Sequence, residues 1–180
     1  MTDDARFRWI VATMAVRPRD RILEIGPGSS ASIACLASAL NGGHYVGIDR
    51  SATAIDRATK RHAALVASGR VRLVRAGLEE LSAGSVVGGI DFGAASFDKV
   101  LAINVNLFWT RSPAAELAVI RELLVPGGTL TLCYGYGGPE AAPAGPKPPG
   151  DKLTRYLAAS GFTARTVGAG DLFGVVATAE

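Results

Sequence analysis

The sequence has few of the features that mark membrane proteins and metal-binding proteins. No run of apolar residues reaches the length of about 18 that a membrane-spanning helix needs, and residues 1–8 carry charges where a signal peptide would be apolar. The two cysteines, Cys35 and Cys133, have no Cys-x-x-Cys or histidine neighbour. Metal ligands usually come in such spacings. We therefore expect a cytoplasmic protein with no membrane span and no metal site.

The sequence also lacks a run of like charges. Lys and Arg total 19 against 16 for Asp and Glu, which gives a formal net charge of +3. The densest basic stretches are residues 17–21 and 70–75. Nucleic-acid binding requires a concentrated basic face that neutralises several phosphates. The scattered charges predict an ordinary solvated surface, and nucleic acid is not an expected partner.

Apolar residues are plentiful, at 48% of the 180 residues, which is enough for one well-packed domain over 1–180. Short apolar runs alternate with segments of helical periodicity. The expected strands are 21–25, 44–48, 71–75, 97–103, 129–134, 162–167 and 173–178. The expected helices are 6–16 within an N-terminal segment 1–17, a helix capped by Ser29 or Ser30 that ends near Leu40, 51–67, 113–124 with Ser112 as its N-cap, and 151–160.

Alternation of this kind predicts an α/β fold with a mostly parallel sheet and helices on both faces. The expected strands number seven, and the last two form an antiparallel hairpin around residues 168–171. Residues 76–96 read as an irregular, Gly-rich connection. Residues 136–150 are so rich in Gly and Pro that we expect a mobile loop there.

Two sequence features stand at strand ends, where such sheets bind ligands. The first is the segment LEIGPGSS, in which a strand ends and the chain turns at Gly26 and Gly28 before a helix begins. Glycines allow a ligand to approach the backbone, and the helix start offers free N–H groups. The second is Asp49, 23 residues after Gly26, whose carboxylate can accept hydrogen bonds from both hydroxyls of a ribose. Together they predict a nucleoside site.

The sequence resembles the class I S-adenosylmethionine (SAM)-dependent methyltransferases in five segments that occur in the family's order. These segments are LEIGPGSS, VGIDRS, RVRLVRAGLEEL, FDKVLAINVNLFW and LLVPGGTLTL. They span roughly residues 20–134. The resemblance implies a Rossmann-like fold, SAM as cofactor and methyl transfer as the activity.

The resemblance also implies roles for individual residues. Gly26 and Gly28, with Pro27 between them, would line the methionine part of SAM, and Glu24 would organise its ammonium group. At the nucleoside, Asp49 would hold the ribose, Arg50 would flank the adenine, Leu78 would offer its backbone N–H to the adenine, and Asn104 would line the cofactor near the sulfonium. The sequence departs from the family at Ser30, where a third glycine is common, and at Gly77, where the family often has an Asp that binds the adenine amino group.

The acceptor side is less defined. Asn106, Phe108 and Trp109 follow the fourth of the main strands, where an acceptor would bind, and they are the candidate substrate-binding residues. Asn106 can equally be a turn former, and the two aromatic residues can equally be core packing. The sequence shows no pair of side chains that is typical of a general base, so no catalytic residue is assigned. We expect catalysis by positioning of the reactants.

Two other classes of function remain open at this point. The segment Gly26-x-Gly28-x-x-Ala31 also satisfies the relaxed dinucleotide fingerprint of NAD(P)-dependent oxidoreductases. Glu24 just before the loop and the absence of a Tyr-x-x-x-Lys pair argue against that class. The other alternative is a SAM- or nucleoside-binding module that acts in a complex. We expect a small-molecule acceptor, with a homo-oligomer or a partner protein as open possibilities.

Overall fold

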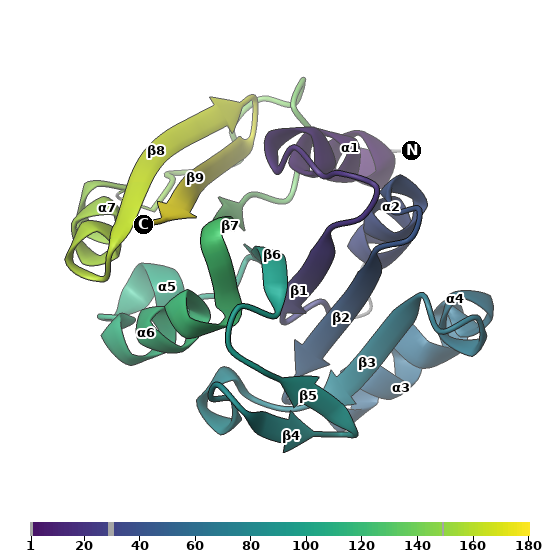
Figure 1. The fold of residues 1–180 in the computed structure, drawn as a ribbon. Coiled ribbons are helices and arrows are strands. Elements are labelled where there is room, and N and C mark those ends of the chain that lie inside the picture. Colours follow the sequence, from purple (N-terminus) through teal and green to yellow (C-terminus); the bar gives the residue numbers. More distant parts are fainter. Residues whose placement is uncertain (1, 29–30, 149) are drawn as a thin grey trace.

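The computed structural model describes residues 2–28, 31–148 and 150–180 (Figure 1). Its main sheet has seven strands in the order β3-β2-β1-β6-β7-β9-β8. The first five of these strands are parallel, whereas β9 runs antiparallel to both β7 and β8. The predicted sheet and its C-terminal hairpin are therefore confirmed. The strands are β1 (Arg21–Ile25), β2 (His44–Asp49), β3 (Val71–Arg75), β6 (Phe97–Ile103), β7 (Leu124–Tyr134), β8 (Phe162–Ala169) and β9 (Leu172–Ala179).

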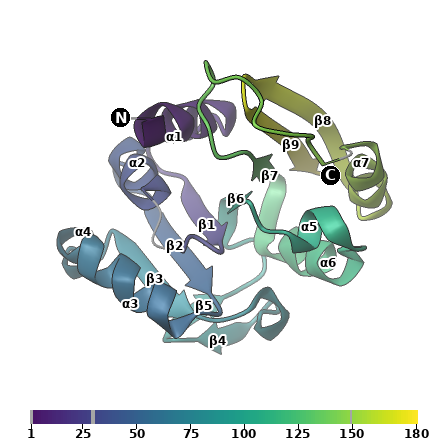
Figure 2. The same ribbon diagram turned by 180° about the vertical axis from the view of Figure 1, so that it is seen from behind.

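Helices cover both faces of the sheet (Figures 1 and 2). One hydrophobic cluster joins α1 and α2 to the sheet through Phe7, Ile33 and Leu101, all at most 1% exposed. A second cluster lies on the other face and joins α6 and α7 to it through Leu117 and Leu157, both fully buried. The helices are α1 (Thr2–Thr13), α2 (Ser32–Ala39), α3 (Ala52–Arg61), α4 (Ala63–Ala67), α5 (Leu107–Thr110), α6 (Ala114–Leu123), α7 (Gly150–Ala159) and the 3-10 helix η1 (Leu78–Glu80).

The observed helices differ from the predicted ones in three places. The helix expected over 51–67 is two helices, α3 and α4, which meet at His62, a buried residue with a non-helical backbone. The segment 107–110, for which no element was predicted, forms the short helix α5. Ser112 is not the N-cap of α6, because Pro113 occupies that position. Ser29 and Ser30, the predicted caps of α2, lie outside the described residues, and Ala31 stands at the cap of that helix.

Two strand predictions also needed correction. Residues 76–96 contain a hairpin of strands β4 (Ser85–Val87) and β5 (Ile90–Phe92), which turns at Gly88 and Gly89. Strand β7 begins at Leu124, five residues earlier than expected, because Leu124 pairs with Phe97 before Thr129 pairs with Lys99. Residues 125–128 therefore form a bulge within β7 and not a turn before it.

The Pro- and Gly-rich segment after β7 is fastened by one buried carboxylate. Asp171 lies in the turn between β8 and β9 and is 1% exposed. Its oxygens accept the backbone N–H groups of Tyr136, Gly137 and Ala144 at 2.7–3.0 Å, and the Lys147 ammonium also contacts them. These bonds hold the pKa of Asp171 well below its usual range. The mobility expected for this loop stays a prediction. Any large motion of the loop would have to break the contacts with Asp171.

Candidate functional site

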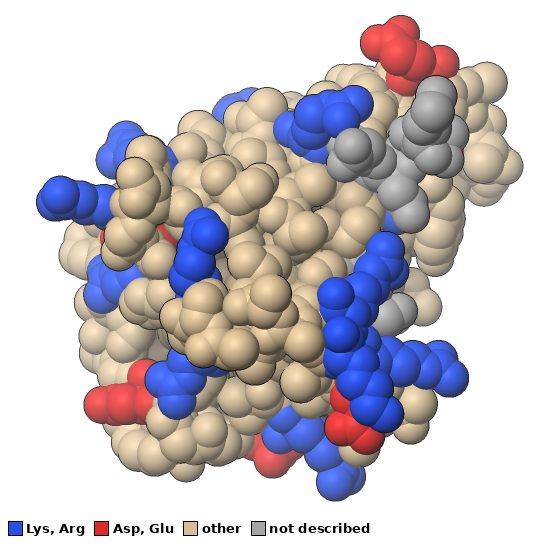
Figure 3. All heavy atoms as spheres, turned by 90° about the vertical axis from the view of Figure 1, so that its right-hand side faces the viewer, with Lys and Arg blue, Asp and Glu red and all other residues tan. Residues whose placement is uncertain are grey.

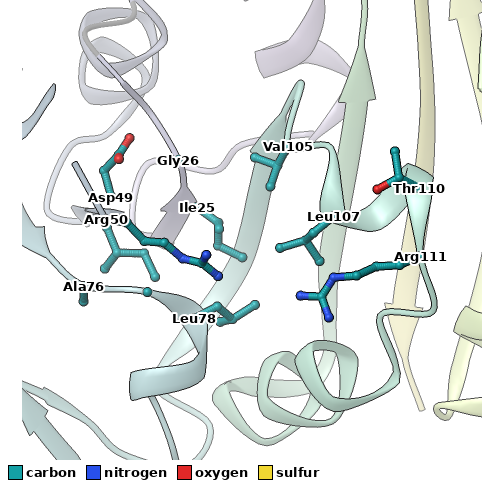
Figure 4. A pocket seen from close by; sticks show the side chains of 12 residues that line it. Ile25, Gly26, Asp49, Arg50, Ala76, Leu78, Val105, Leu107, Thr110 and Arg111 are labelled. Atoms are coloured by element: carbon teal, nitrogen blue, oxygen red, sulfur yellow. The ribbon is translucent and has the colours of Figure 1, made fainter.

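A cavity of about 450 Å³ opens at the carboxyl ends of the parallel strands (Figure 4). Its walls come from the segments that follow β1, β2, β3 and β6, and from α5. This is the edge at which open α/β sheets bind ligands, and the volume lies within the usual range for small-molecule sites. The lining residues are Ile25, Gly26, Ile48, Asp49, Arg50, Ala76, Gly77, Leu78, Val105, Leu107, Thr110 and Arg111.

The first wall is the turn after β1. Gly26 and Gly28 both have left-handed backbones, with φ of 68° and 58°, a conformation that favours glycine. A Cβ at Gly26 would lie 3.1 Å from the Val105 side chain, whereas nothing among the described residues lies within 4 Å of a Cβ at Gly28. The turn is held to β2 because the Gly26 N–H donates to the Ile48 carbonyl at 2.8 Å. The two glycines thus keep the backbone free of side chains beside the cavity.

The second wall is the end of β2, where Asp49 faces the glycine turn. Its Oδ2 accepts the Gly28 N–H at 3.1 Å, and its Oδ1 accepts the Ser51 N–H at 2.9 Å. The structure therefore brings together the two sequence features that predicted a nucleoside site. A carboxylate offers about four lone-pair positions, so each oxygen can accept one more hydrogen bond. Asp49 lines the cavity and keeps capacity for two further donors.

The third wall follows β3. The Gly77 N–H donates to the Glu80 carboxylate at 2.7 Å, which fixes the start of η1. Leu78 is 2% exposed and lines the cavity. Across the described part of the chain, its N–H donates to no acceptor. The Arg50 guanidinium extends over this wall (Figure 4) and pairs with the Glu79 carboxylate at 2.9 Å.

Glu24 does not line the cavity. It is 1% exposed, and its carboxylate accepts hydrogen bonds from the Ser32 hydroxyl at 2.9 Å and the Tyr45 hydroxyl at 2.8 Å. Burial raises the pKa of Glu24 to about 7, although the bonds from Tyr45 and Ser32 oppose the rise. The carboxylate thus ties β1 to β2 and α2, and its predicted role at an ammonium group stays a prediction.

Asn104 stands at the end of β6 with a left-handed backbone, φ of 55°. Asparagine tolerates this conformation better than most residues. Its side chain exchanges two hydrogen bonds with Gly135, accepting its N–H at 2.9 Å and donating to its carbonyl at 3.0 Å. The residue therefore joins the ends of β6 and β7, and it directs the following Val105 into the cavity wall.

We expect the replacement of Asn104 by Ala to lower the free energy of unfolding by about 2 kcal/mol, because the left-handed backbone becomes strained and the Gly135 groups lose their partners. Asn104→Gly should cost less, since glycine relieves the backbone strain and loses only the hydrogen bonds. Urea unfolding of the three proteins measures the difference. Equal stability of the Ala variant and the wild type would contradict this account of Asn104.

The three candidate acceptor residues lie in or beside α5, outside the cavity wall. Asn106 is at the N-cap of α5, and its carbonyl accepts the Trp109 N–H at 2.9 Å. Phe108 is 2% exposed and belongs to the hydrophobic core. The Trp109 ring packs against Tyr134 and Phe173, with centroid distances of 6.1 and 5.9 Å. These contacts agree with the turn-forming and packing alternatives, and a role in acceptor binding stays a prediction.

Four lining residues around α5 were missing from the sequence-based site. They are Val105, Leu107, Thr110 and Arg111. The Arg111 guanidinium points across the cavity (Figure 4) and pairs with Glu116 at 2.6 Å. A four-residue helix is too short to show periodicity, so nothing in the sequence distinguished these positions from their neighbours.

Two further expectations concern sites of other kinds. The residues that the structure describes contain no cluster of three His, Cys, Asp or Glu side chains able to hold a metal ion. No described helix has both the length and the apolar character that crossing a bilayer requires. Figure 3 shows the face that carries α1 to α4. Some Lys and Arg side chains stand apart from one another, and others form a group toward the right-hand side with acidic side chains beside them.

The sheet order, the glycine turn and the acid after β2 define a Rossmann-like nucleoside-binding fold. The methyltransferase-domain family matches residues 23–130, which is more than half of the chain. The chain belongs to this family: it is a SAM-dependent methyltransferase with SAM as its cofactor. This result does not support the NAD(P)-dependent alternative.

Solved structures show the same fold at low sequence identity. A SAM-dependent methyltransferase from Aquifex aeolicus is 15% identical, with a TM-score of 0.75, over 97% of this chain and 89% of that one. The pyocyanin biosynthetic protein PhzM is 18% identical, with a TM-score of 0.72, over 98% of this chain and 55% of that one. A chain solved with the Haloferax volcanii Trm112 methyltransferase activator is 13% identical, with a TM-score of 0.72, over 98% and 90%. Curated protein sequences gave no match.

Proposed function

We propose that this methyltransferase binds SAM in the cavity at the carboxyl ends of β1, β2 and β3 and transfers its methyl group to a small-molecule acceptor. The observation that carries the proposal is the contact between the Gly28 N–H and the Asp49 carboxylate at the cavity wall. It supports a site in which one carboxylate faces both the glycine turn and the cavity. The residues assigned to the cofactor are Glu24, Gly26, Pro27, Gly28, Asp49, Arg50, Gly77, Leu78 and Asn104.

The chemistry of this cavity fits a nucleoside with an amino-acid tail. Asp49 keeps acceptor capacity for a pair of hydroxyl groups, and the free N–H of Leu78 suits a ring nitrogen of adenine. Ile25, Ile48 and Ala76 supply apolar surface for the base. The open space at Gly28 leaves room for the tail. Because Gly77 stands where the family often has an Asp, packing and the backbone would hold the adenine.

The residues around the cavity act chiefly by positioning. Bound SAM supplies a methyl group on a positively charged sulfur, which is already activated for an in-line displacement. Asp49 orients the sugar, and the glycine turn and Asn104 fix the backbone beside the reacting end. Val105 and Leu107 exclude water from the cavity, which aids a displacement that disperses charge. The charged residues of the described wall are Asp49, Arg50 and Arg111. Asp49 accepts the Gly28 N–H, and the two arginines form ion pairs with glutamates. We assign none of the three as a general base.

The acceptor would bind beyond α5, where the segment following β6 closes the cavity. A small molecule is favoured because the described chain adds only α1, the β4–β5 hairpin and residues 136–148 to the main sheet and its helices, which provides little surface for a large acceptor. The alternative is that a partner protein completes the acceptor side, as the activator complex of the Haloferax volcanii protein illustrates for another chain.

The test is incubation of the purified protein with methyl-labelled SAM and a panel of small molecules that carry oxygen, nitrogen, sulfur or carbon nucleophiles. We expect label in at least one acceptor, and less label with an Asp49→Ala variant at a SAM concentration near the wild-type Kd. Tight binding of SAM without turnover of any small molecule would contradict the proposal and favour a module that works in a complex. A parallel incubation uses a cell extract in place of the small molecules. If label appears only in proteins of that extract, the acceptor is a protein and not a small molecule.

A further inference from the structure

A second cavity of about 370 Å³ lies at the opposite, amino-terminal edge of the sheet. It is formed by the end of α1, the starts of β1 and β6, the bulge of β7 and the neighbouring residues of β8 and β9. Because the strands separate this edge from the carboxyl edge, the cavity is distinct from the methyl-transfer site. Its volume falls in the range of small-molecule sites.

Lys99 lines this cavity, and its ammonium group is only weakly paired with a carboxylate. The residue is 8% exposed, and its ammonium lies 3.7 Å from the Asp20 carboxylate, beyond hydrogen-bond distance. Among the residues that the structure describes, it has no other acidic partner within 4.0 Å. Burial lowers the pKa of Lys99, and Arg17 adds to the effect, while Asp20 and Asp98 oppose it. A buried ammonium with three donors and one distant acceptor is costly unless a further anion binds to it.

A buried hydroxyl group without a partner among the described residues lies behind the wall of this cavity. Thr129 begins the regular part of β7, opposite Lys99 in the sheet. Its Oγ1 is buried and has no hydrogen-bond partner within the described ranges. The oxygen has almost no accessible surface, so it does not face the open space of the cavity. Of these two residues, Lys99 is therefore the one that offers donors to the cavity.

The remaining charges favour an anion. Arg17 and Arg165 are exposed residues that line the cavity, so with Lys99 it has three cationic side chains. Two carboxylates also line it, but both are engaged. Asp20 accepts the Arg17 N–H at 2.8 Å, and Asp98 accepts the Arg21 N–H and Nε–H at 2.8 and 3.0 Å. The excess charge of the lining is therefore positive.

The backbone beside the cavity is also unusual. Ala15 lines it with a left-handed conformation, φ of 49°, which side chains other than Asn and Asp seldom adopt. Strain of this kind tends to occur at ligand sites and costs of order 1–3 kcal/mol. It ends α1 so that Arg17 and Asp20 are brought to the cavity.

From this geometry we infer that the amino-edge cavity binds a small molecule through a phosphate group, which contacts Lys99, with Arg17 and Arg165 at the entrance. A phosphate monoester carries a charge of about −1.5 to −2 at pH 7 and has three acceptor oxygens, which suit a cavity whose three cations outnumber its two carboxylates. Lysine binds such groups as a point charge. The cavity is larger than a single phosphate, so the organic part has room within it.

The inference is tested by NMR titration of the ¹⁵N-labelled protein with sodium phosphate, and separately with phenyl phosphate, at constant ionic strength held with chloride. We expect saturable shifts of the amides around Lys99, in the β7 bulge and at the end of α1. Tighter binding of phenyl phosphate would identify a phosphate monoester as the ligand, and equal binding would identify free phosphate. Shifts that never saturate would overturn the inference.

Matched variants locate the binding. Lys99→Met removes the charge but keeps the apolar stem, and we expect at least a tenfold loss of affinity. Thr129→Val is nearly isosteric and removes only a hydroxyl that is closed off from the cavity, so it should leave binding unchanged. Lys60→Met, on the exposed face of α3, should change nothing. Unchanged affinity in Lys99→Met would indicate an adventitious ion only. SAM binding should persist in every variant, so this test does not depend on the proposed methyl-transfer site.

Discussion

Replacing Asp49 with Ala should weaken the binding of S-adenosylhomocysteine, the product form of the cofactor, by about 5- to 150-fold, which corresponds to about 1–3 kcal/mol. The variant loses the carboxylate that would accept the two ribose hydroxyls. It also removes the acceptor that holds the Gly28 N–H, so the glycine turn is less well positioned. Isothermal titration calorimetry measures the effect directly and needs no knowledge of the acceptor.

Two controls separate binding from folding. Asp56→Ala removes an exposed carboxylate on α3 and should leave the affinity unchanged. Asp49→Asn keeps one oxygen acceptor and should fall between the wild type and the Ala variant. Thermal unfolding of each protein shows whether the fold is intact. If a folded Asp49→Ala protein binds with wild-type affinity, the ribose role of Asp49 has to be abandoned.

Glu24 is expected to make the protein less stable as the pH rises from about 4.5 to about 7. Its pKa in the folded state is about 7, against an ordinary value of 4.5, so the folded state binds the proton more tightly than the unfolded state does. The stability that this proton provides is therefore fully present below about pH 4.5 and is lost as the pH rises to about 7. The expected loss is about 3 kcal/mol.

A Glu24→Gln variant isolates this contribution. Glutamine cannot ionise, yet its carbonyl can accept from Tyr45 and its amide can donate to Ser32. We expect the variant to gain stability over the wild type between pH 5 and pH 8, as measured by urea unfolding. His44, whose lowered pKa acts in the opposite direction, is present in both proteins and cancels in the comparison. A stability difference that does not vary with pH would contradict the assignment.

The parts of the fold that the sequence predicted are those with a strong local signal. The strands before Gly26 and Asp49 are apolar runs that end at a turn residue, and the observed ends differ little from the expected ones. The β4–β5 hairpin was missed because each strand has three residues, although Gly88 and Gly89 form a two-residue turn that is typical of hairpins. The break at His62 interrupts a helical pattern that is continuous in the sequence.

The site was predicted unevenly for a related reason. Gly26 and Asp49 are identified by residue type at a strand end, and the parallel sheet brings such ends together. The direction of the Glu24 side chain depends on Tyr45, a hydrogen-bond partner 21 positions away. The residue pattern around Glu24 gives no sign of this pairing. Val105, Leu107, Thr110 and Arg111 reach the cavity because α5 turns back over the sheet edge, and no propensity scale anticipates a helix of one turn.

The buried carboxylate of Asp171 has a consequence for how this chain tolerates change. Because the same side chain receives the N–H groups of Gly137 and Ala144, residues 138–143 form a small circuit whose two ends are pinned at one point. Lengthening such a circuit costs little, about 0.6 kcal/mol for each doubling, since the closure itself is unchanged. Inserted residues or a fused peptide should be accepted there while the C-terminal hairpin keeps its register, which makes this circuit the natural place to attach a reporter group.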